Sequence, residues 1–233
     1  MYFYSLYKNV VAGFFFLFLV SALALHADNF TIFNTGVDDT ATVLAPGSID
    51  PHWSIVSGAD VTGTNAYTVT EVPSAWYASP TGATSTASWI APNPDQSTVD
   101  SLSNPFSTYD YQTTFDLTGF DPTTASITGV FSTDNNLTDV LINGISTGIT
   151  SDFSGFGSVN PFSITSGFQS GVNTLDFILV NGDDSDNPAG PTGLIVDSAV
   201  GTAQPLAAPE PGVISLVLFS IFTLAIMFRR KLT

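Results

Sequence analysis

The chain has 233 residues, of which 20 are Asp or Glu and four are Lys or Arg, so its formal net charge is −16. All four basic residues lie near the two ends (Lys8, Arg229, Arg230 and Lys231), and the long region between them contains no Lys or Arg. This argues against nucleic acid as a partner, because phosphate binding depends on these two residue types. The absence of cysteine excludes disulfides, thiolate metal sites and a cysteine nucleophile.

The first segment has the layout of a secretory signal peptide. Lys8 is followed by an apolar stretch over 10–25 and then by small residues, which is the order of charge, apolar core and cleavage site in such signals. We expect residues 1–27 to be a signal peptide, with cleavage by signal peptidase after Ala24 or after Ala27. An uncleaved membrane anchor is the alternative.

Residues 28–205 are predicted to form one all-β domain. They are rich in Val, Ile, Thr, Phe and Tyr, in short segments separated by Gly, Pro, Asn and Asp, as strands and their turns are. Residues 91–108 and 182–193 are rich in Pro, Asn, Asp and Ser and are predicted loops. The predicted strands are 31–33, 67–72, 109–116, 126–131, 139–142, 162–164, 174–180 and 194–198.

Two local patterns are specific enough to predict geometry. Over 109–117, alternate residues are expected to share one face of a strand, because side chains in a strand alternate with period two. Asn143-Gly144 lies between an apolar run over 140–142 and Ile145. Both residues tolerate positive φ, so the pair predicts a two-residue β-hairpin. Short strands at regular spacing favour a jelly-roll β-sandwich.

A family resemblance rests on the order of motifs in the second half. A strand over 139–142 ends at Asn143-Gly144, and Gly171, Asn173 and Leu175 then open a long segment in a Gly-x-Asn-x-Leu pattern. This order, over roughly residues 105–200, resembles galactose-binding-like jelly rolls, including the sugar-binding domains appended to many glycoside hydrolases. The resemblance implies the fold, whereas the motifs specify turns and strand starts, so a ligand does not follow from them.

The residues that could carry enzymatic chemistry are few. His52 is the one histidine within 28–205, and no nucleophile motif accompanies it. Nucleophilic catalysis by serine or threonine needs a base beside the nucleophile, so the sequence predicts a protein that is not an enzyme. A secreted glycoside hydrolase with a carboxylate pair is a weaker alternative, since such enzymes need only two acidic residues.

Four aromatic residues are candidates for ligand binding. Trp53, Trp76, Tyr77 and Trp89 could form a platform on which a sugar ring stacks. Aromatic side chains also fill the cores of β proteins, and the sequence leaves both interpretations open.

An acidic loop is a candidate calcium site. Asp183, Asp184 and Asp186 stand close together between Asn181 and Asn187, and calcium prefers such oxygen ligands. The spacing departs from that of an EF-hand loop. A solvated turn without a metal is therefore the alternative, and calcium is the one cofactor that the sequence suggests.

The C-terminal tail, residues 206–233, carries the most specific motif of the chain. Pro209-Glu210-Pro211 is followed by an apolar run over 212–228 and then by Arg229-Arg230-Lys231. The run is about long enough to cross a bilayer as a transmembrane helix, with its basic end in the cytoplasm.

This tail resembles the PEP-CTERM sorting signal of Gram-negative bacteria, which implies recognition and cleavage by an exosortase during export through the inner membrane. A permanent single-pass anchor is the alternative. With both ends read as signals, we expect a cell-surface or extracellular protein, held transiently in the membrane by its tail, that interacts with extracellular polysaccharide or matrix. A structural or adhesive matrix component without a specific glycan ligand is the competing hypothesis.

Overall fold

The protein is described by a computed structural model over residues 26–58, 64–78, 86–96, 107–182 and 190–206. These residues confirm the predicted all-β class: their strands form one antiparallel sheet, and one 3-10 turn, η2 (Phe153–Gly157), is the helical structure among them. No helix in this part of the chain is long and apolar enough to span a membrane. Residues 1–25 of the predicted signal peptide and 207–233 of the predicted tail lie outside the described residues.

The sheet has 11 strands in the order β8-β7-β10-β5-β2-β3-β4-β11-β6-β9, with β1 paired to β11. The strands are β1 (Asp28–Phe30), β2 (Ile49–Ser57), β3 (Asn65–Thr68), β4 (Ile90–Ala91), β5 (Ser107–Asp116), β6 (Phe120–Asp134), β7 (Asn136–Ile142), β8 (Ile145–Ser146), β9 (Asn160–Ile164), β10 (Val172–Asn181) and β11 (Gly193–Pro205).

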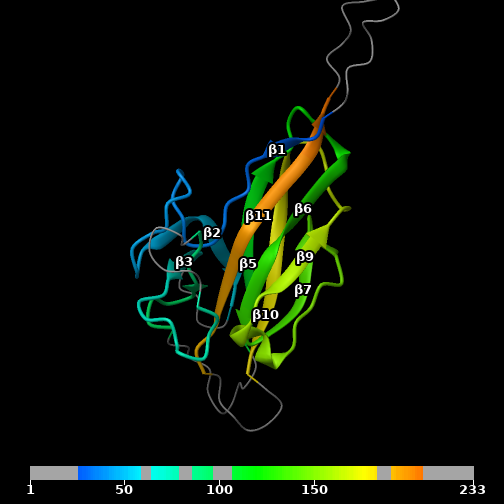
Figure 1. The fold of residues 1–233 in the computed structure, drawn as a ribbon. Helices are drawn as coiled ribbons and strands as arrows, with labels where there is room; N and C mark the ends of the chain where they lie inside the picture. Colours follow the sequence, from blue (N-terminus) through cyan, green and yellow to red (C-terminus); the bar gives the residue numbers. More distant parts are fainter. Residues whose placement is uncertain (1–25, 59–63, 79–85, 97–106, 183–189, 207–233) are drawn as a thin grey trace, which may run out of the picture.

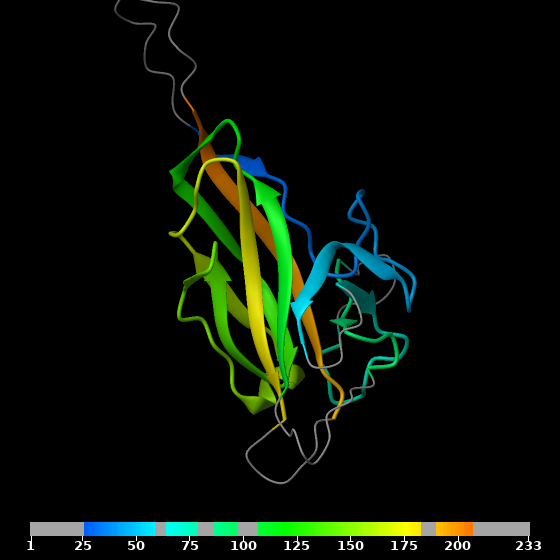
Figure 2. The ribbon, with the colours of Figure 1, turned by 180° about the vertical axis from the view of Figure 1, so that it is seen from behind.

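The sheet folds back on itself to form two layers. Figures 1 and 2 show β5, β7 and β10 in one layer and β6, β9 and β11 in the other, with β2, β3 and β4 at the side. Phe177 of β10 contacts Phe131 of β6 and Phe162 of β9, with ring centroids 5.7 and 5.8 Å apart. Phe30 of β1 stacks on Phe115 of β5 at 5.2 Å. The core therefore lies between the layers, where these edge-to-face and stacked rings remove apolar surface from water.

The predicted alternation along β5 is confirmed. Thr114 and Asp116 are exposed and Asp110 and Gln112 are half-buried, so the polar face of this strand points away from the core. The opposite face is buried and consists of Tyr109, Tyr111, Thr113, Phe115 and Leu117.

Strand boundaries differ from prediction near the N-terminus. The predicted strand over 31–33 is wrong, because β1 ends at Phe30, which pairs with Gly201 of β11. The next residues of β11, between Asp197 and Val200, contain a register shift. Because β11 is irregular there, it cannot continue a regular ladder with the residues after Phe30. β2 is a strand that the sequence did not predict, and it contains Pro51, a residue that is rare inside a sheet because it has no backbone donor.

The predicted Asn143-Gly144 hairpin is confirmed. Ile142 of β7 pairs with Ile145 of β8, and the two turn residues have φ of +52° and +76°. The Asn143 side chain also ties the turn to β10, because its Oδ1 accepts a hydrogen bond from the Thr174 amide at 3.0 Å.

Replacing Gly144 with Val should destabilise the domain by about 1–3 kcal/mol, as for other strained backbone sites. A Cβ at Gly144 would meet no atom within 4 Å, so the loss would come from the positive φ alone, which a β-branched residue resists. Gly144→Asn is the matched control and should cost less, since Asn adopts this conformation readily. Chemical denaturation measures both, and equal midpoints for wild type and Gly144→Val would contradict the strain.

Candidate functional site

The candidate site arises from an irregularity in β2. Ile49 pairs with Tyr67 and Ser54 with Asn65, so five steps along β2 match two along β3. Pro51, which has no N–H to give to a ladder, lies in this stretch. The extra residues form a β-bulge, a feature that re-aims side chains at the rim of a sheet.

A polar cavity of about 310 Å³ lies beside the bulge, between β2, β3 and β5. It is lined by residues 50–54 of β2, by Thr64 and Asn65, and by 112–114 of β5. On the β5 side, Trp53 pairs with Thr113 and Ser54 with Gln112, so regular pairing resumes along this wall.

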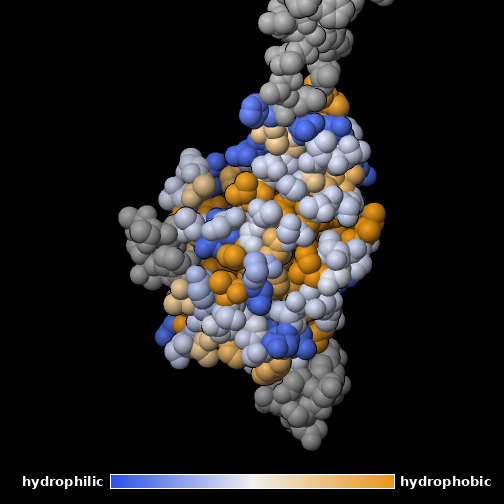
Figure 3. Space-filling model, turned by 45° about the vertical axis from the view of Figure 1, so that its right-hand side comes forward, coloured by the Kyte–Doolittle hydropathy of each residue, from blue (hydrophilic) through white to orange (hydrophobic). Residues whose placement is uncertain are grey.

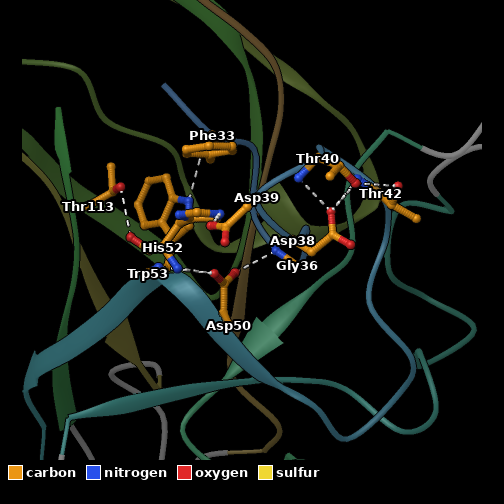
Figure 4. A network of polar contacts seen from close by, with 10 residues as sticks. All are labelled: Phe33, Gly36, Asp38, Asp39, Thr40, Thr42, Asp50, His52, Trp53 and Thr113. Atoms are coloured by element: carbon orange, nitrogen blue, oxygen red, sulfur yellow. Dashed lines mark hydrogen bonds and ion pairs between the residues drawn. The ribbon is translucent and has the colours of Figure 1, made fainter. Parts of the chain in front are cut away.

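A buried carboxylate holds the bulge in place. Asp50 is 3% exposed, and its two oxygens accept hydrogen bonds from the amides of Gly36 (2.6 Å), His52 (2.8 Å) and Trp53 (3.0 Å). Burial raises the pKa of Asp50, and the three N–H donors act in the opposite direction. The carboxylate thus joins β2 to the loop that contains Gly36, as Figure 4 shows.

The aromatic side chains next to Asp50 pack against Phe33. The imidazole of His52 stacks on the Phe33 ring, with centroids 3.5 Å apart and planes 4° from parallel. Trp53 donates from Nε1 to the Phe33 carbonyl at 3.1 Å, and Thr113 Oγ1 donates to the His52 carbonyl at 2.9 Å. These contacts, visible in Figure 4, restrain one end of the cavity.

The His52 imidazole faces an exposed carboxylate. Its Nε2 lies 3.4 Å from Asp39 Oδ1, a distance that suits an ion pair when the ring is protonated. The geometry is not that of a hydrogen bond, and within the described residues this buried nitrogen makes none. The contact therefore leaves the imidazole with hydrogen-bonding capacity.

The loop that carries Asp39 is shaped by its neighbour Asp38. One Asp38 oxygen accepts from the Thr40 hydroxyl at 2.7 Å and from the amides of Thr40 and Thr42 at 2.8 and 3.0 Å. The Thr40 hydroxyl bond, followed by the two amides, lowers the pKa of Asp38. This is the Asx-turn chemistry by which Asp stabilises a loop.

Two carboxyl groups, Asp110 of β5 and Asp176 of β10, lie close to each other, and Asp176 is bonded to Gln112 of the cavity lining. Gln112 donates from Nε2 to Asp176 Oδ1 at 2.6 Å, and the Thr174 hydroxyl donates to the other oxygen at 3.2 Å. Burial, followed by repulsion from Asp176, raises the pKa of Asp110 to about 6. Because a carboxylate only accepts hydrogen bonds, Asp176 turns the side-chain nitrogen of Gln112 toward itself. The side-chain oxygen of Gln112 is then left as an acceptor.

Of the four aromatic candidates, the structure places the three tryptophans in the interior and leaves Tyr77 half-buried. Trp53 lies in the main core, with its ring 5.9 Å from Phe177. Trp76 and Trp89 contact each other at 4.3 Å in a second cluster, and the half-buried Tyr77 packs against it. The three tryptophans are at most 5% exposed, so the core interpretation describes their positions.

A buried acid belongs to the second aromatic cluster. Asp134 is 5% exposed and accepts a hydrogen bond from Trp76 Nε1 at 2.5 Å and another from the side-chain Nδ2 of Asn135. Burial, opposed by the bond from Trp76, raises the pKa of Asp134 to about 7. No motif in the sequence distinguishes Asp134 from the turn-forming aspartates.

The other predicted sites fall on residues that the structure does not describe. The calcium candidates Asp183, Asp184 and Asp186 lie outside the described residues, as do Pro209, Glu210, Pro211, Arg229, Arg230 and Lys231 of the sorting motif. Among the residues that are described, no three His, Cys, Asp or Glu side chains gather as they would around a metal ion.

The cavity residues Thr64, Asn65 and Gln112 were not predicted as a site. The predicted alternation along β5 places Gln112 on the outer face of the strand. It does not predict which residues of other strands lie beside Gln112. Pro51 within a β-rich region is the local signal that could have indicated a bulge. The comparisons add no family: neither a scan against models of known protein families nor a search of curated proteins finds a match to this chain.

Proposed function

We propose that this is an exported, surface-associated protein without enzymatic activity, sorted by an exosortase-type system and interacting with extracellular polysaccharide. The observation that carries the proposal is the order of Pro209-Glu210-Pro211, an apolar run and a basic end in one short tail. The apolar N-terminal segment supports export, because a secretory signal and a sorting signal act on the same chain.

We propose a galactose-binding-like jelly-roll β-sandwich as the finer description of the fold. Support comes from the two facing layers and from their strand connections, since β5 and β6, β9 and β10, and β10 and β11 follow each other in the chain but lie in opposite layers. The turn at Asn143-Gly144 and the start of β10 at Val172, within the Gly-x-Asn-x-Leu segment, also support this description.

The ends of the described domain lie on one side of it. Asp28 of β1 pairs with Ala203 of β11, and the Leu206 amide bonds to the Gly119 carbonyl at 2.8 Å. Figure 1 shows β1 and the end of β11 at the same end of the layers. A domain joined at this end to a membrane segment would present the bulge of β2 on its flank.

The surface chemistry argues against anionic partners and is compatible with neutral ones. Only 10% of the residues of the whole chain are charged, and 28–205 contains no Lys or Arg to bind an anionic polymer. Figure 3 shows one face on which apolar and hydrophilic residues alternate in small areas. Hydroxyl-rich polymers match such a surface through hydrogen bonds.

A structural matrix role is the second candidate function. The burial of Trp53, Trp76 and Trp89 favours it, because these rings present no stacking platform to a glycan. This role needs export and sorting but no specific ligand.

Processing of the tail is the test of the proposal. We expect the exported protein to lack residues 229–233, which intact-mass measurement on protein from the native host detects. Pro209→Ala combined with Pro211→Ala should keep these residues, because it removes the extended tripeptide. A complete C-terminus on the exported wild type would leave a plain membrane anchor.

A further inference from the structure

We infer that the cavity between β2, β3 and β5 is the ligand site of this protein and that its ligand is a neutral, hydroxyl-rich molecule the size of one sugar ring. The inference rests on the proposed function. It places the binding site at this cavity and not at the buried tryptophans. Its starting point is the volume of about 310 Å³, at the lower end of the range of small-molecule sites.

The walls of the cavity are held before any ligand arrives. On one side Asp50 accepts hydrogen bonds from three backbone amides. On the other side the Thr113 hydroxyl donates to the His52 carbonyl. The Gln112 amide is oriented by Asp176, which is 4% exposed. Groups that are fixed in this way lose little conformational freedom on binding.

The lining selects against charge. The hydroxyls of Ser54, Thr64 and Thr114 and the amides of Asn65 and Gln112 offer both donors and acceptors. An anionic ligand would lie beside Asp50, which lines the cavity, and near Asp176, which is bonded to Gln112, with no Lys or Arg within 28–205 to offset their charge. A metal ion would find the oxygens of Asp50 already occupied by three N–H donors.

Sugar hydroxyls complement such a lining, since each hydroxyl both donates and accepts. Trp53 borders the cavity but is 2% exposed, so we expect recognition by hydrogen bonds more than by stacking. Hydrogen bonds to water compete with these contacts, and a dissociation constant of about 1 mM, equivalent to about −4 kcal/mol, is expected.

The test is a titration of the isotope-labelled, exported protein with glucose, galactose and glucuronate, followed by amide NMR signals. A neutral sugar should shift the signals of Ser54, Asn65 and Thr114. Gln112→Leu should weaken binding about tenfold, whereas Gln169→Leu, the same replacement at an exposed glutamine of the β9–β10 loop, should not. Thr114→Val, at an exposed position, should also weaken binding, and it keeps the test valid if Gln112→Leu does not fold.

The outcomes separate the two proposals when a glycan array is run on the same protein. Array binding with shifts elsewhere, or with affinity unchanged by Gln112→Leu and Thr114→Val, overturns the cavity as the site and leaves polysaccharide binding intact. Glucuronate binding more tightly than both neutral sugars overturns the ligand class. No binding on the array and none in the titration overturns the polysaccharide function together with this inference.

Discussion

The free energy of unfolding should fall by about 4 kcal/mol between pH 4 and pH 8 through Asp134 alone. Burial in the native state raises the pKa of this carboxyl from 3.8 to about 7. Each unit of difference between the two pKa values corresponds to about 1.4 kcal/mol. Because the folded pKa lies above the unfolded one, the native state holds the proton more tightly. This stabilisation is complete below about pH 4 and is lost as the pH rises to about 7.

Asp134→Asn separates this effect from the other carboxyl groups. Asp50 and Asp110 also have raised pKa values, so the wild type contains contributions of the same sign. The variant cannot ionise, and its curve of unfolding free energy against pH should be flatter than that of wild type. It should be less stable than wild type at pH 4, because one amide oxygen replaces two acceptors facing Trp76 and Asn135.

Chemical denaturation at several pH values measures both curves. Asp28→Asn is the control, since it removes one exposed negative charge from β1 without touching the cluster around Trp76. Its curve should run close to that of wild type. Parallel curves for wild type and Asp134→Asn would show that folding does not raise the pKa of Asp134.

Asn173→Ala should cost about 4 kcal/mol of unfolding free energy. The Asn173 side chain is fully buried, and its Oδ1 accepts from Asn143 Nδ2 and from the Gln169 amide, both at 2.8 Å. Its Nδ2 donates to the carbonyls of Gln169 and Gly171, also at 2.8 Å. Alanine would leave these four part-buried groups without their partner. A fully buried group left unpaired costs about 1–3 kcal/mol, and water and relaxation reduce the sum for these four.

The matched control is Asn29→Ala, which makes the same replacement at an exposed position of β1. It should change the unfolding free energy by less than about 0.5 kcal/mol. Urea denaturation distinguishes the two variants. A loss below about 1 kcal/mol for Asn173→Ala would mean that water replaces the side chain and that the β7–β8 turn and the β9–β10 loop do not depend on it.

The sequence by itself determined features that depend on local backbone preferences. Period-two alternation along β5 predicted which face is buried, because strand geometry alone sends successive side chains to opposite sides. Asn143-Gly144 predicted a hairpin for a similar reason, since the ability to adopt positive φ is a property of these two residue types. The motifs of the two ends, on which the proposals of export and sorting depend, are likewise contiguous in the chain.

Only the tertiary structure decided which residues from distant segments of the chain lie next to each other. The cavity joins the bulge around Pro51 to Asn65 and Gln112, and the register shift that brings them together depends on pairing among β2, β3 and β5. The same holds for Asp134, whose raised pKa comes from burial next to Trp76. Burial and pairing between distant segments are set by how the layers pack, which no short stretch of sequence encodes.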